Sequence, residues 1–276
     1  MAQIVGGFFL PHVPLILAEA QAAQPEQAKR VHAAFDKIVV RLRDLRVDTV
    51  ITIGADHYGL FGPHCVPQCL IGVGDLDGPA EPWLGLERGP VADNSPLAKH
   101  ILKHGHEAGV DWAFATSFVL DHAAMVPYHL TTAKVPNVRT IPVYLNEAVE
   151  PLIPSRRAHE IGRQLLAAVE SWHGDERVAV YGTGGISHWV GTAEMGRVNE
   201  DFDRHILELV EAGDVESLIA ITDTEILEQA GNGAAEIKSW ICAMGAMPGG
   251  KGDIIAYEAV REWVCGFGFA EFKIAA

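Results

Sequence analysis

Four residues that lie far apart along the chain have side chains that could together form an iron site: His12, His57, His188 and Glu236. Two imidazoles and one carboxylate on one face of a ferrous ion leave coordination positions open for a substrate and for dioxygen. A further histidine beside such a site could carry protons, because an imidazole titrates near neutral pH. The set therefore indicates oxygenase chemistry, provided that the fold brings the four side chains together.

Each of these residues also has a simpler interpretation when it is considered alone. His12 lies between two prolines, which would hold its loop rigidly, yet it could equally be a turn histidine packed against the surface. Asp56 could orient a neighbouring group or simply cap the loop that carries His57. Glu236 stands near the start of a predicted helix, where a surface glutamate is the more ordinary expectation.

A glycine-rich turn at 182–185 precedes His188. Three glycines in four residues let the backbone adopt positive φ angles or pass close to a ligand. The turn lacks the GxGxxG pattern and the Walker lysine of nucleotide-binding loops. We therefore expect it to present His188 to a pocket. His122 could supply a second group that handles protons beside it. Three further side chains could line the same pocket: Tyr128, His129 and Trp189.

The bulk composition is that of an ordinary globular protein. Of the 276 residues, 49% are hydrophobic and 21% are charged. The chain has 36 acidic and 21 basic residues, a net charge of -15, and no cluster of Lys or Arg. A nucleic-acid partner is therefore not expected. The apolar run at 4–10 is soon interrupted by Pro11, so neither a signal peptide nor a membrane span is expected.

The cysteines and the missing motifs narrow the choice of chemistry. The four cysteines contain no CxxC pair, which favours neither a disulfide framework nor a structural zinc site, and a reducing cytoplasm fits best. The chain has no HExxH motif and no GxSxG nucleophile elbow, so neither a zincin protease nor a serine hydrolase is indicated.

The elements that must position these residues can be predicted from the hydrophobic patterns. Strands are expected at 4–10, 47–53, 68–73, 113–120, 138–145 and 177–181. Helices are expected at 18–43, 95–108 and 154–172, and the chain after His188 reads as mostly helical, at 199–212, 215–220, 223–229 and 234–247. Pro25 could break the first helix, and Pro142 indicates an edge strand or a bulge. The segment 75–90 reads as irregular and could cover a pocket with Trp83.

The alternation of strands and helices over the first 190 residues or so predicts an α/β fold, a layered domain with a central mixed sheet flanked by helices. We expect one catalytic domain across residues 1–276. Open α/β sheets bind their ligands beyond the strand ends. Four histidines each follow a predicted strand within a few residues: His12, His57, His122 and His188. Their positions after the strands favour an arrangement in which the four side chains lie close together.

Five segments, taken together and in order, resemble the class III (LigB-type) extradiol ring-cleavage dioxygenases over nearly the whole chain. They are Pro11-His12-Val13-Pro14, Asp56-His57-Tyr58, Asp121-His122, the turn 184–188 and the stretch 235–240. The second and fifth segments, with 262–268, are similar to dihydroxyphenylpropionate dioxygenases. The stretch 196–203 looks more like the β subunit of protocatechuate 4,5-dioxygenase and gallate dioxygenase. The chain lacks an appended small helical domain like the protocatechuate α subunit.

The resemblance implies a LigB-like fold and a role for each residue. His12, His57 and Glu236 would be the ligands of Fe(II). His188 would be the acid–base residue, and His122 would line the pocket for substrate and dioxygen. The implied reaction is extradiol (meta) cleavage of a catecholic ring, of the protocatechuate or gallate type or an alkyl-catechol, with insertion of both atoms of O2.

Several alternatives stay open at this point. A heteroaromatic diol-like ring such as a hydroxypyridone would chelate iron in the same way. A non-catalytic subunit or a zinc hydrolase on the same fold would belong to different classes, although all the expected ligands are present. The expected partners are a small aromatic substrate and O2, without a nucleic acid or a membrane, in a cytoplasmic homo-oligomer.

Overall fold

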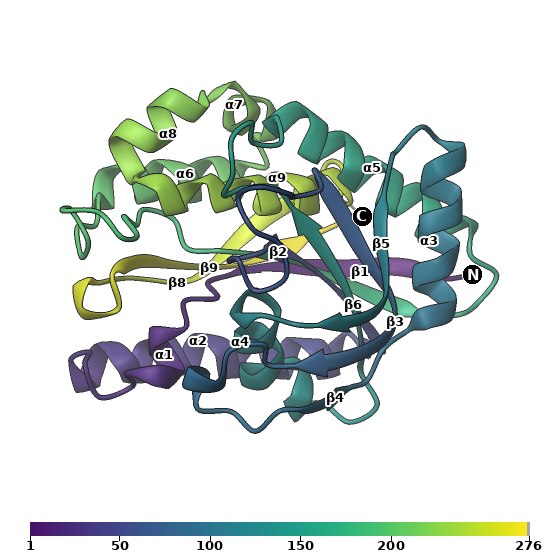
Figure 1. Ribbon diagram of the computed structural model, residues 1–276, viewed down its shortest axis with the longest axis horizontal. Coiled ribbons are helices and arrows are strands. Elements are labelled where there is room, and N and C mark those ends of the chain that lie inside the picture. Colours follow the sequence, from purple (N-terminus) through teal and green to yellow (C-terminus); the bar gives the residue numbers. More distant parts are fainter. Residues whose placement is uncertain (275–276) are drawn as a thin grey trace.

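The computed structural model describes residues 1–274, so the last two residues of the expected domain lie outside it. Its centre is a nine-stranded mixed sheet (Figure 1). The strands are β1 (Gln3–Leu10), β2 (Thr49–Ala55), β3 (Cys69–Gly78), β4 (Gly89–Val91), β5 (Ala113–Val119), β6 (Arg139–Leu145), β7 (Arg177–Thr183), β8 (Lys251–Val260) and β9 (Cys265–Lys273). They are ordered β4-β3-β6-β2-β7-β1-β9-β8 in space, and β5 pairs with β3. The predicted α/β fold with a mixed sheet is confirmed.

Four neighbouring parallel strands, β6, β2, β7 and β1, form the middle of this sheet. Every residue of β2 is buried, as expected for a parallel strand that is covered on both faces. Because the four strands are parallel, their carboxyl ends meet at one edge of the sheet. The segments that carry His12, His57, Glu147 and His188 leave the sheet at this edge.

Helices cover both faces of the sheet (Figure 1). They are α1 (Leu15–Ala18), α2 (Pro25–Asp44), α3 (Ser95–Glu107), α4 (His122–Leu130), α5 (Ser155–Ser171), α6 (Glu200–Ala212), α7 (Val215–Ala220), α8 (Asp223–Ala230) and α9 (Ile237–Gly245). Adjacent residues of β1 face opposite layers: Phe8 packs with α2 and α4, and Phe9 packs with α5, α6 and α9. None of the helices within residues 1–274 combines the length and apolarity needed to cross a membrane.

The C-terminal part of the chain differs from the expectation that it is mostly helical. Strands β8 and β9 form an antiparallel hairpin, and β9 pairs with β1, which extends the sheet by two strands. Strand β9 is rich in glycine, which is normally depleted in strands. A Cβ on Gly266 would lie 1.9 Å from Asp203 Oδ2, and one on Gly268 would lie 2.6 Å from Ile186. These glycines therefore allow close packing against the segments around His188.

Proline positions give one confirmed and one wrong prediction. Pro25 does interrupt the first predicted helix, because α1 ends at Ala18 and α2 begins at Pro25. Pro142, however, lies on the interior strand β6 and not at an edge. The antiparallel β3–β6 ladder ends at the pair Ile71–Val143, just before Pro142, and the proline ring packs over Gly72 instead. Strand β3 therefore makes no pairing with the proline.

The segment 75–90 is more regular than predicted. Strand β3 continues to Gly78, a short 3-10 turn spans Pro82–Leu84, and β4 follows. Trp83 in this turn is exposed, and its ring centroid lies 6.1 Å from that of His122. The segment thus lies beside the expected site.

Candidate metal centre

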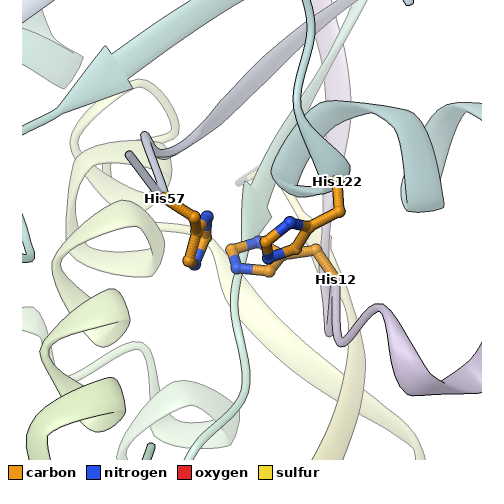
Figure 2. Close-up of side chains that lie close together, drawn as sticks. All are labelled: His12, His57 and His122. Atoms are coloured by element: carbon orange, nitrogen blue, oxygen red, sulfur yellow. The ribbon is translucent and has the colours of Figure 1, made fainter. Parts of the chain in front are cut away.

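Three histidines from separate elements point toward one another (Figure 2). His12 follows β1, His57 follows β2, and His122 is the first residue of α4. The ring centroids of His12 and His57 are 4.9 Å apart, and those of His57 and His122 are 4.0 Å apart. Each ring offers one nitrogen within 4.8 Å of the others, so the fold brings these predicted residues together.

Glu236 is distant in sequence from these three histidines, but its carboxylate lies at the same point in the structure. It ends the 3-10 turn Asn232–Glu236 that leads into α9, and it is buried. Its Oε1 lies 3.0 Å from His12 Nε2 and 3.1 Å from His57 Nε2. Its Oε2 accepts a hydrogen bond from the backbone N–H of Gly185 at 2.9 Å. One carboxylate oxygen is thus fixed by the backbone while the other faces both histidines.

The hydrogen-bond partners of the Nδ1 atoms set the tautomers of His12 and His57. Thr183 donates its hydroxyl proton to the carbonyl of Ile53 at 2.9 Å, so its Oγ1 accepts from His12 Nδ1 at 3.0 Å. Asp121 Oδ2 accepts from His57 Nδ1 at 3.1 Å. A metal-binding histidine characteristically donates its second ring N–H in this way. Both Nε2 lone pairs are therefore directed at Glu236 Oε1.

This arrangement fits a metal ion. Two nitrogen lone pairs facing a carboxylate oxygen are three acceptors in contact, and such a contact requires a proton or a cation between them. Ligands about 2.1 Å from a metal and at right angles to each other lie about 3.0 Å apart. The two measured contacts of Glu236 Oε1, at 3.0 and 3.1 Å, match that separation. The donor set of two imidazoles and one carboxylate suits ferrous iron.

Burial and hydrogen bonding shift the pKa values of these three groups in different directions. Burial lowers the pKa of His12, which favours the neutral form that a ligand needs. Burial also acts to lower the pKa of His57, but the bonds to Asp121 and Glu236 outweigh it and raise that pKa to about 10. Burial alone would raise the pKa of Glu236, yet its contacts with His12 and His188 hold that pKa well below its ordinary value.

His12, His57 and Glu236 form a triad of contacting side chains. His188 lies on the other side of Glu236 and outside this triad. Its ring is buried, with Nδ1 3.2 Å from the carbonyl of Ile186 and Nε2 3.5 Å from Glu236 Oε2. Burial acts to lower the pKa of His188, but neighbouring Cys265 and Glu236 outweigh it and raise the pKa well above its ordinary value. Nδ1 donates to the carbonyl, which leaves Nε2 available at the site.

Two glycines make room for these side chains. A Cβ on Gly233 would lie 2.1 Å from His188 Nε2, and one on Gly184 would lie 2.5 Å from the Cβ of Glu236. Gly184 also has a φ of 144°, which residues with side chains rarely adopt. The expected role of the glycine-rich turn, to let the backbone pass close to a functional group, is consistent with these distances.

His122 has a carboxylate partner that the sequence did not reveal. Its Nδ1 lies 2.6 Å from Glu81 Oε1, while Glu81 Oε2 is buried and has no hydrogen-bond partner among residues 1–274. Nδ1 therefore donates to Glu81, and Nε2 is left on the side of the other two histidines. Glu81 lies in the segment 75–90, which was expected to cover a pocket but contained no motif that marked this residue.

The carboxylate that orients His57 is Asp121 and not the adjacent Asp56. Asp56 accepts from the backbone N–H groups of Leu60 and Phe61, both at 3.1 Å, and so caps its own loop. Asp121 is fully buried, and although burial acts to raise its pKa, the contact with His57 holds that pKa well below the ordinary value. The Asp121-His122 motif after a predicted strand was the signal that could have identified it.

The three side chains expected to line the pocket lie elsewhere around the site. A cavity of about 120 Å³ beside the triad is lined by His57, Glu236 and His188, among others, but not by Tyr128, His129 or Trp189. Tyr128 is half-buried and His129 is exposed on α4. Trp189 is buried, with the guanidinium of Arg197 4.6 Å from its ring centroid.

Glu147 is a further carboxyl group in the cavity that sequence patterns did not mark. It follows β6 and is buried, and its Oε1 accepts from the hydroxyl of Ser239 at 2.9 Å. Burial and the nearby Glu236 raise its pKa well above the ordinary value. The four cysteines are all free thiols, and three of them are buried, in agreement with the expected absence of a disulfide framework.

Comparisons with known proteins found a matching family model and several similar proteins. The family model for the catalytic LigB subunit of aromatic ring-opening dioxygenases matches residues 6–268. A Rhodococcus 2,3-dihydroxyphenylpropionate/2,3-dihydroxicinnamic acid 1,2-dioxygenase is 27% identical, with 88% of this chain and 91% of the relative covered. The enzyme of that name from Burkholderia vietnamiensis is 26% identical, with 95% and 92% covered.

A solved structure shows a similar fold. An uncharacterized protein from Escherichia coli K12 superposes with a TM-score of 0.57 at 12% identity, over 98% of this chain and 100% of the other. At this identity the likeness concerns the fold alone.

Proposed function

Because the chain belongs to the LigB family of aromatic ring-opening dioxygenases, we propose that His12, His57 and Glu236 bind Fe(II) in its active site. The family and the matched relatives make the chain an extradiol ring-cleavage dioxygenase. The proposal concerns the identity of the metal, its ligands, the acid–base residues and a catechol-type substrate that is cleaved beside its two hydroxyls.

One observation carries the ligand assignment. Glu236 Oε1 contacts both Nε2 atoms at the separation of neighbouring metal ligands, and both Nδ1 atoms are occupied by acceptors. His122 also offers a nitrogen near this point. We assign it outside the ligand set because no contact of that length joins it to Glu236 and because its Nδ1 is bonded to Glu81.

The chain's own residues then perform the proton transfers. Bound at this site, Fe(II) supplies a Lewis acid that lowers the pKa of a substrate hydroxyl, and a centre at which substrate and dioxygen meet. His188 Nε2, which lies 3.5 Å from Glu236 Oε2, would accept the proton of that hydroxyl, while Nδ1 keeps its bond to the carbonyl of Ile186. Cys265 and then Glu236 raise the pKa of His188, and a cation bound to Glu236 would offset the contribution of that carboxylate.

His122 handles a proton on the other side of the site. Its Nε2 faces the histidine cluster, and the Glu81 carboxylate holds the ring in place through Nδ1. Two imidazoles thus flank the reacting ring, one beside His57 and one beside Glu236. Such an arrangement allows one group to take up the substrate proton and the other to deliver a proton to the developing product.

The remaining expectations stay part of the proposal. We infer one catalytic domain over residues 1–276, supported by the single sheet that all nine strands of residues 1–274 join. The free buried thiols support a reducing, cytoplasmic environment. A homo-oligomer remains an expectation.

The test uses protein purified without oxygen. We expect about one iron per chain, oxygen consumption with a panel of catechols, gallates and hydroxypyridones, and a new absorbance from the ring-opened product. Glu236→Gln should lose most of the iron, because an amide oxygen is a weaker ligand than a carboxylate. The exposed Glu208 on α6 provides the matched control, Glu208→Gln. Zinc in place of iron, with no oxygen uptake on any ring, would contradict the proposal.

The acid–base assignment has its own variant. His188→Phe should retain iron and lower turnover by roughly 100- to 10,000-fold, as expected for the loss of a general acid–base group. Undiminished turnover would remove His188 from that role.

A further inference from the structure

Tyr58, the residue after His57, has a backbone conformation that is unusual for its type. Its φ angle is 61°, which lies in the left-handed region. Residues with a side chain seldom adopt this region, and for a bulky residue it marks local strain. Glycine adopts the same angle without a steric clash. A tyrosine at this position therefore carries a steric cost that a glycine would not.

Hydrogen bonds on either side of Tyr58 enforce this conformation. The backbone N–H of His57 donates, at 2.9 Å, to the same carboxylate that orients its ring. The N–H groups of Leu60 and Phe61 donate to the carboxylate of Asp56, both at 3.1 Å. These bonds fix the loop around Tyr58, so the strained angle persists. Residues that are held under strain in this way cluster at ligand-binding and catalytic sites.

Contacts of the Tyr58 side chain within residues 1–274 do little to offset the strain. The residue is 56% exposed, so most of its ring is not packed in the core. Its hydroxyl donates to the carbonyl of Ala148 at 3.4 Å, which is longer than an ordinary hydrogen bond. Neither the packing nor this long bond accounts for a bulky side chain at a strained position.

The Tyr58 side chain lies at the cavity of the metal centre. It lines the cavity of about 120 Å³ together with His57, His188 and Glu236. Ala148, whose carbonyl accepts the bond from the Tyr58 hydroxyl, lines the same cavity. The side chain therefore reaches along this wall from the loop after β2 to the loop after β6. Because it is exposed, its ring has free surface with which it can contact a ligand.

We propose that Tyr58 is a substrate-binding residue, whose ring packs against the aromatic ring of the catechol-type substrate and forms one wall of its cavity. Two aromatic rings in contact attract each other beyond the effect of burying their apolar area. The inference rests on the proposed function, because that function places an aromatic ring in this cavity. Tyr58 takes the role that the sequence suggested for Tyr128, His129 and Trp189, none of which lines the cavity.

Binding of a chromophoric catechol tests this role. The absorbance of 4-nitrocatechol changes when the compound chelates a metal, so it can be titrated into the iron-loaded protein without oxygen. We expect Tyr58→Gly to bind it about tenfold more weakly, which corresponds to the loss of one aromatic contact. Tyr58→Phe keeps the ring and should stay within about twofold of the wild type. Unchanged affinity in Tyr58→Gly, or an equal loss in Tyr58→Phe, would overturn the inference.

The stability of the same variant separates a binding role from a structural one. Glycine removes the strain at position 58, so Tyr58→Gly should unfold at a temperature no lower than that of the wild type, although it binds the ligand less well. A side chain that is needed for packing would give the opposite pair of results, a lower unfolding midpoint and unchanged affinity. A clearly lower midpoint for Tyr58→Gly therefore counts against the inference.

Arg46 provides a matched control at the other end of strand β2. It is exposed, has a φ of 51°, and precedes β2, whereas Tyr58 follows this strand. Arg46→Gly relieves the same kind of strain away from the cavity, which Arg46 does not line. It should leave the affinity for 4-nitrocatechol unchanged. An equally weakened complex in both glycine variants would show an effect of the added glycine and not of the missing ring.

Iron content and oxygen uptake keep this inference apart from the proposed function. Tyr58→Gly should retain its iron, because the ring of His57 keeps its bond to Asp121. Loss of the iron would mean that Tyr58 acts through His57, and the inference would fail. A 4-nitrocatechol complex that depends on Tyr58, without oxygen uptake on any catechol, would support the inference and contradict the proposed function. Oxygen uptake together with equal affinity in the wild type and Tyr58→Gly would contradict the inference alone.

Discussion

Asp121 accepts two hydrogen bonds from His57 on one oxygen, from the backbone N–H at 2.9 Å and from the ring Nδ1 at 3.1 Å. Its other oxygen accepts from the hydroxyl of Tyr144 at 2.6 Å. The carboxylate therefore fixes both the loop and the ring of His57, and it holds the proton on Nδ1. Nε2 is then free to bind a cation beside Glu236.

Asp121→Asn should weaken metal binding. An amide can turn its NH2 group toward Nδ1, which would move the ring proton to Nε2, the atom that must bind the metal. Loss of a carboxylate that supports a ligand histidine typically costs 10- to 100-fold in metal affinity. We expect a loss of about that size, measured by competition with a chromophoric chelator.

The control for this prediction is the neighbouring carboxylate. Asp56→Asn makes the same chemical change next to His57, but Asp56 only caps its loop through Leu60 and Phe61. We expect it to lower the unfolding midpoint slightly and to leave metal affinity within about threefold of the wild type. Equal losses of affinity in the two variants would show that Asp121 does not act through His57.

Gly233→Ala should lower turnover without removing iron. The new methyl group would lie 2.1 Å from His188 Nε2, so the ring must move away from the substrate position. A displaced acid–base group costs roughly 100-fold in rate. We expect kcat to fall by about that factor while iron content and KM change little.

Gly62→Ala provides the comparison for Gly233→Ala. A Cβ at Gly62 would meet nothing within 4 Å, and its φ is not in the positive region. The same added methyl group should therefore leave kcat unchanged. A normal kcat in Gly233→Ala, or an equal fall in both variants, would contradict the role of the space beside His188.

The turn that carries His188 is tied to the C-terminal hairpin through Asp203. This buried carboxylate accepts from the N–H and the hydroxyl of Ser187, at 2.8 and 2.9 Å, and from the hydroxyl of Tyr257 at 2.7 Å. Tyr257→Phe removes one of these bonds and should destabilise the protein by about 1 kcal/mol, whereas Asp203→Ala leaves Ser187 unpaired and should cost roughly 2–3 kcal/mol. Urea unfolding would measure both, and an equal cost would contradict this network.

Sequence patterns predicted the parts of the fold that depend on local periodicity. The strand expected at 47–53 and the helix expected at 95–108 both lie within about two residues of the observed β2 and α3. The β8–β9 hairpin was missed, because the glycines of β9 are explained only by close contacts with distant residues such as Asp203. The prediction for Pro142 was wrong for a similar reason. The point at which the β3–β6 ladder ends depends on how distant strands pair, which the local sequence does not show.

In the site, too, the sequence predicted the residues that local patterns mark and missed those that are brought in by the fold. His12, His57 and His122 were placed together by their positions after strands, and the structure does bring them together. Their supporting groups were not foreseen. Thr183 and Glu81 contact these histidines across 171 and 41 residues of sequence. Serine, threonine and glutamate are common in loops and strand ends, so no local pattern distinguishes such a residue before the fold is known.

The buried pair of Lys238 and Asp223 should respond unequally to the loss of either partner. Lys238 has no exposed surface, whereas the Asp223 side chain is 45% exposed. Asp223→Ala leaves a buried ammonium with only the carbonyl of Ile153, and it should destabilise the protein by about 2–3 kcal/mol. Lys238→Met removes the buried charge and keeps much of the volume, so its cost should stay within about 1 kcal/mol. Urea unfolding midpoints measure the difference, and a larger loss in Lys238→Met would show that the ion pair itself stabilises this part of the fold.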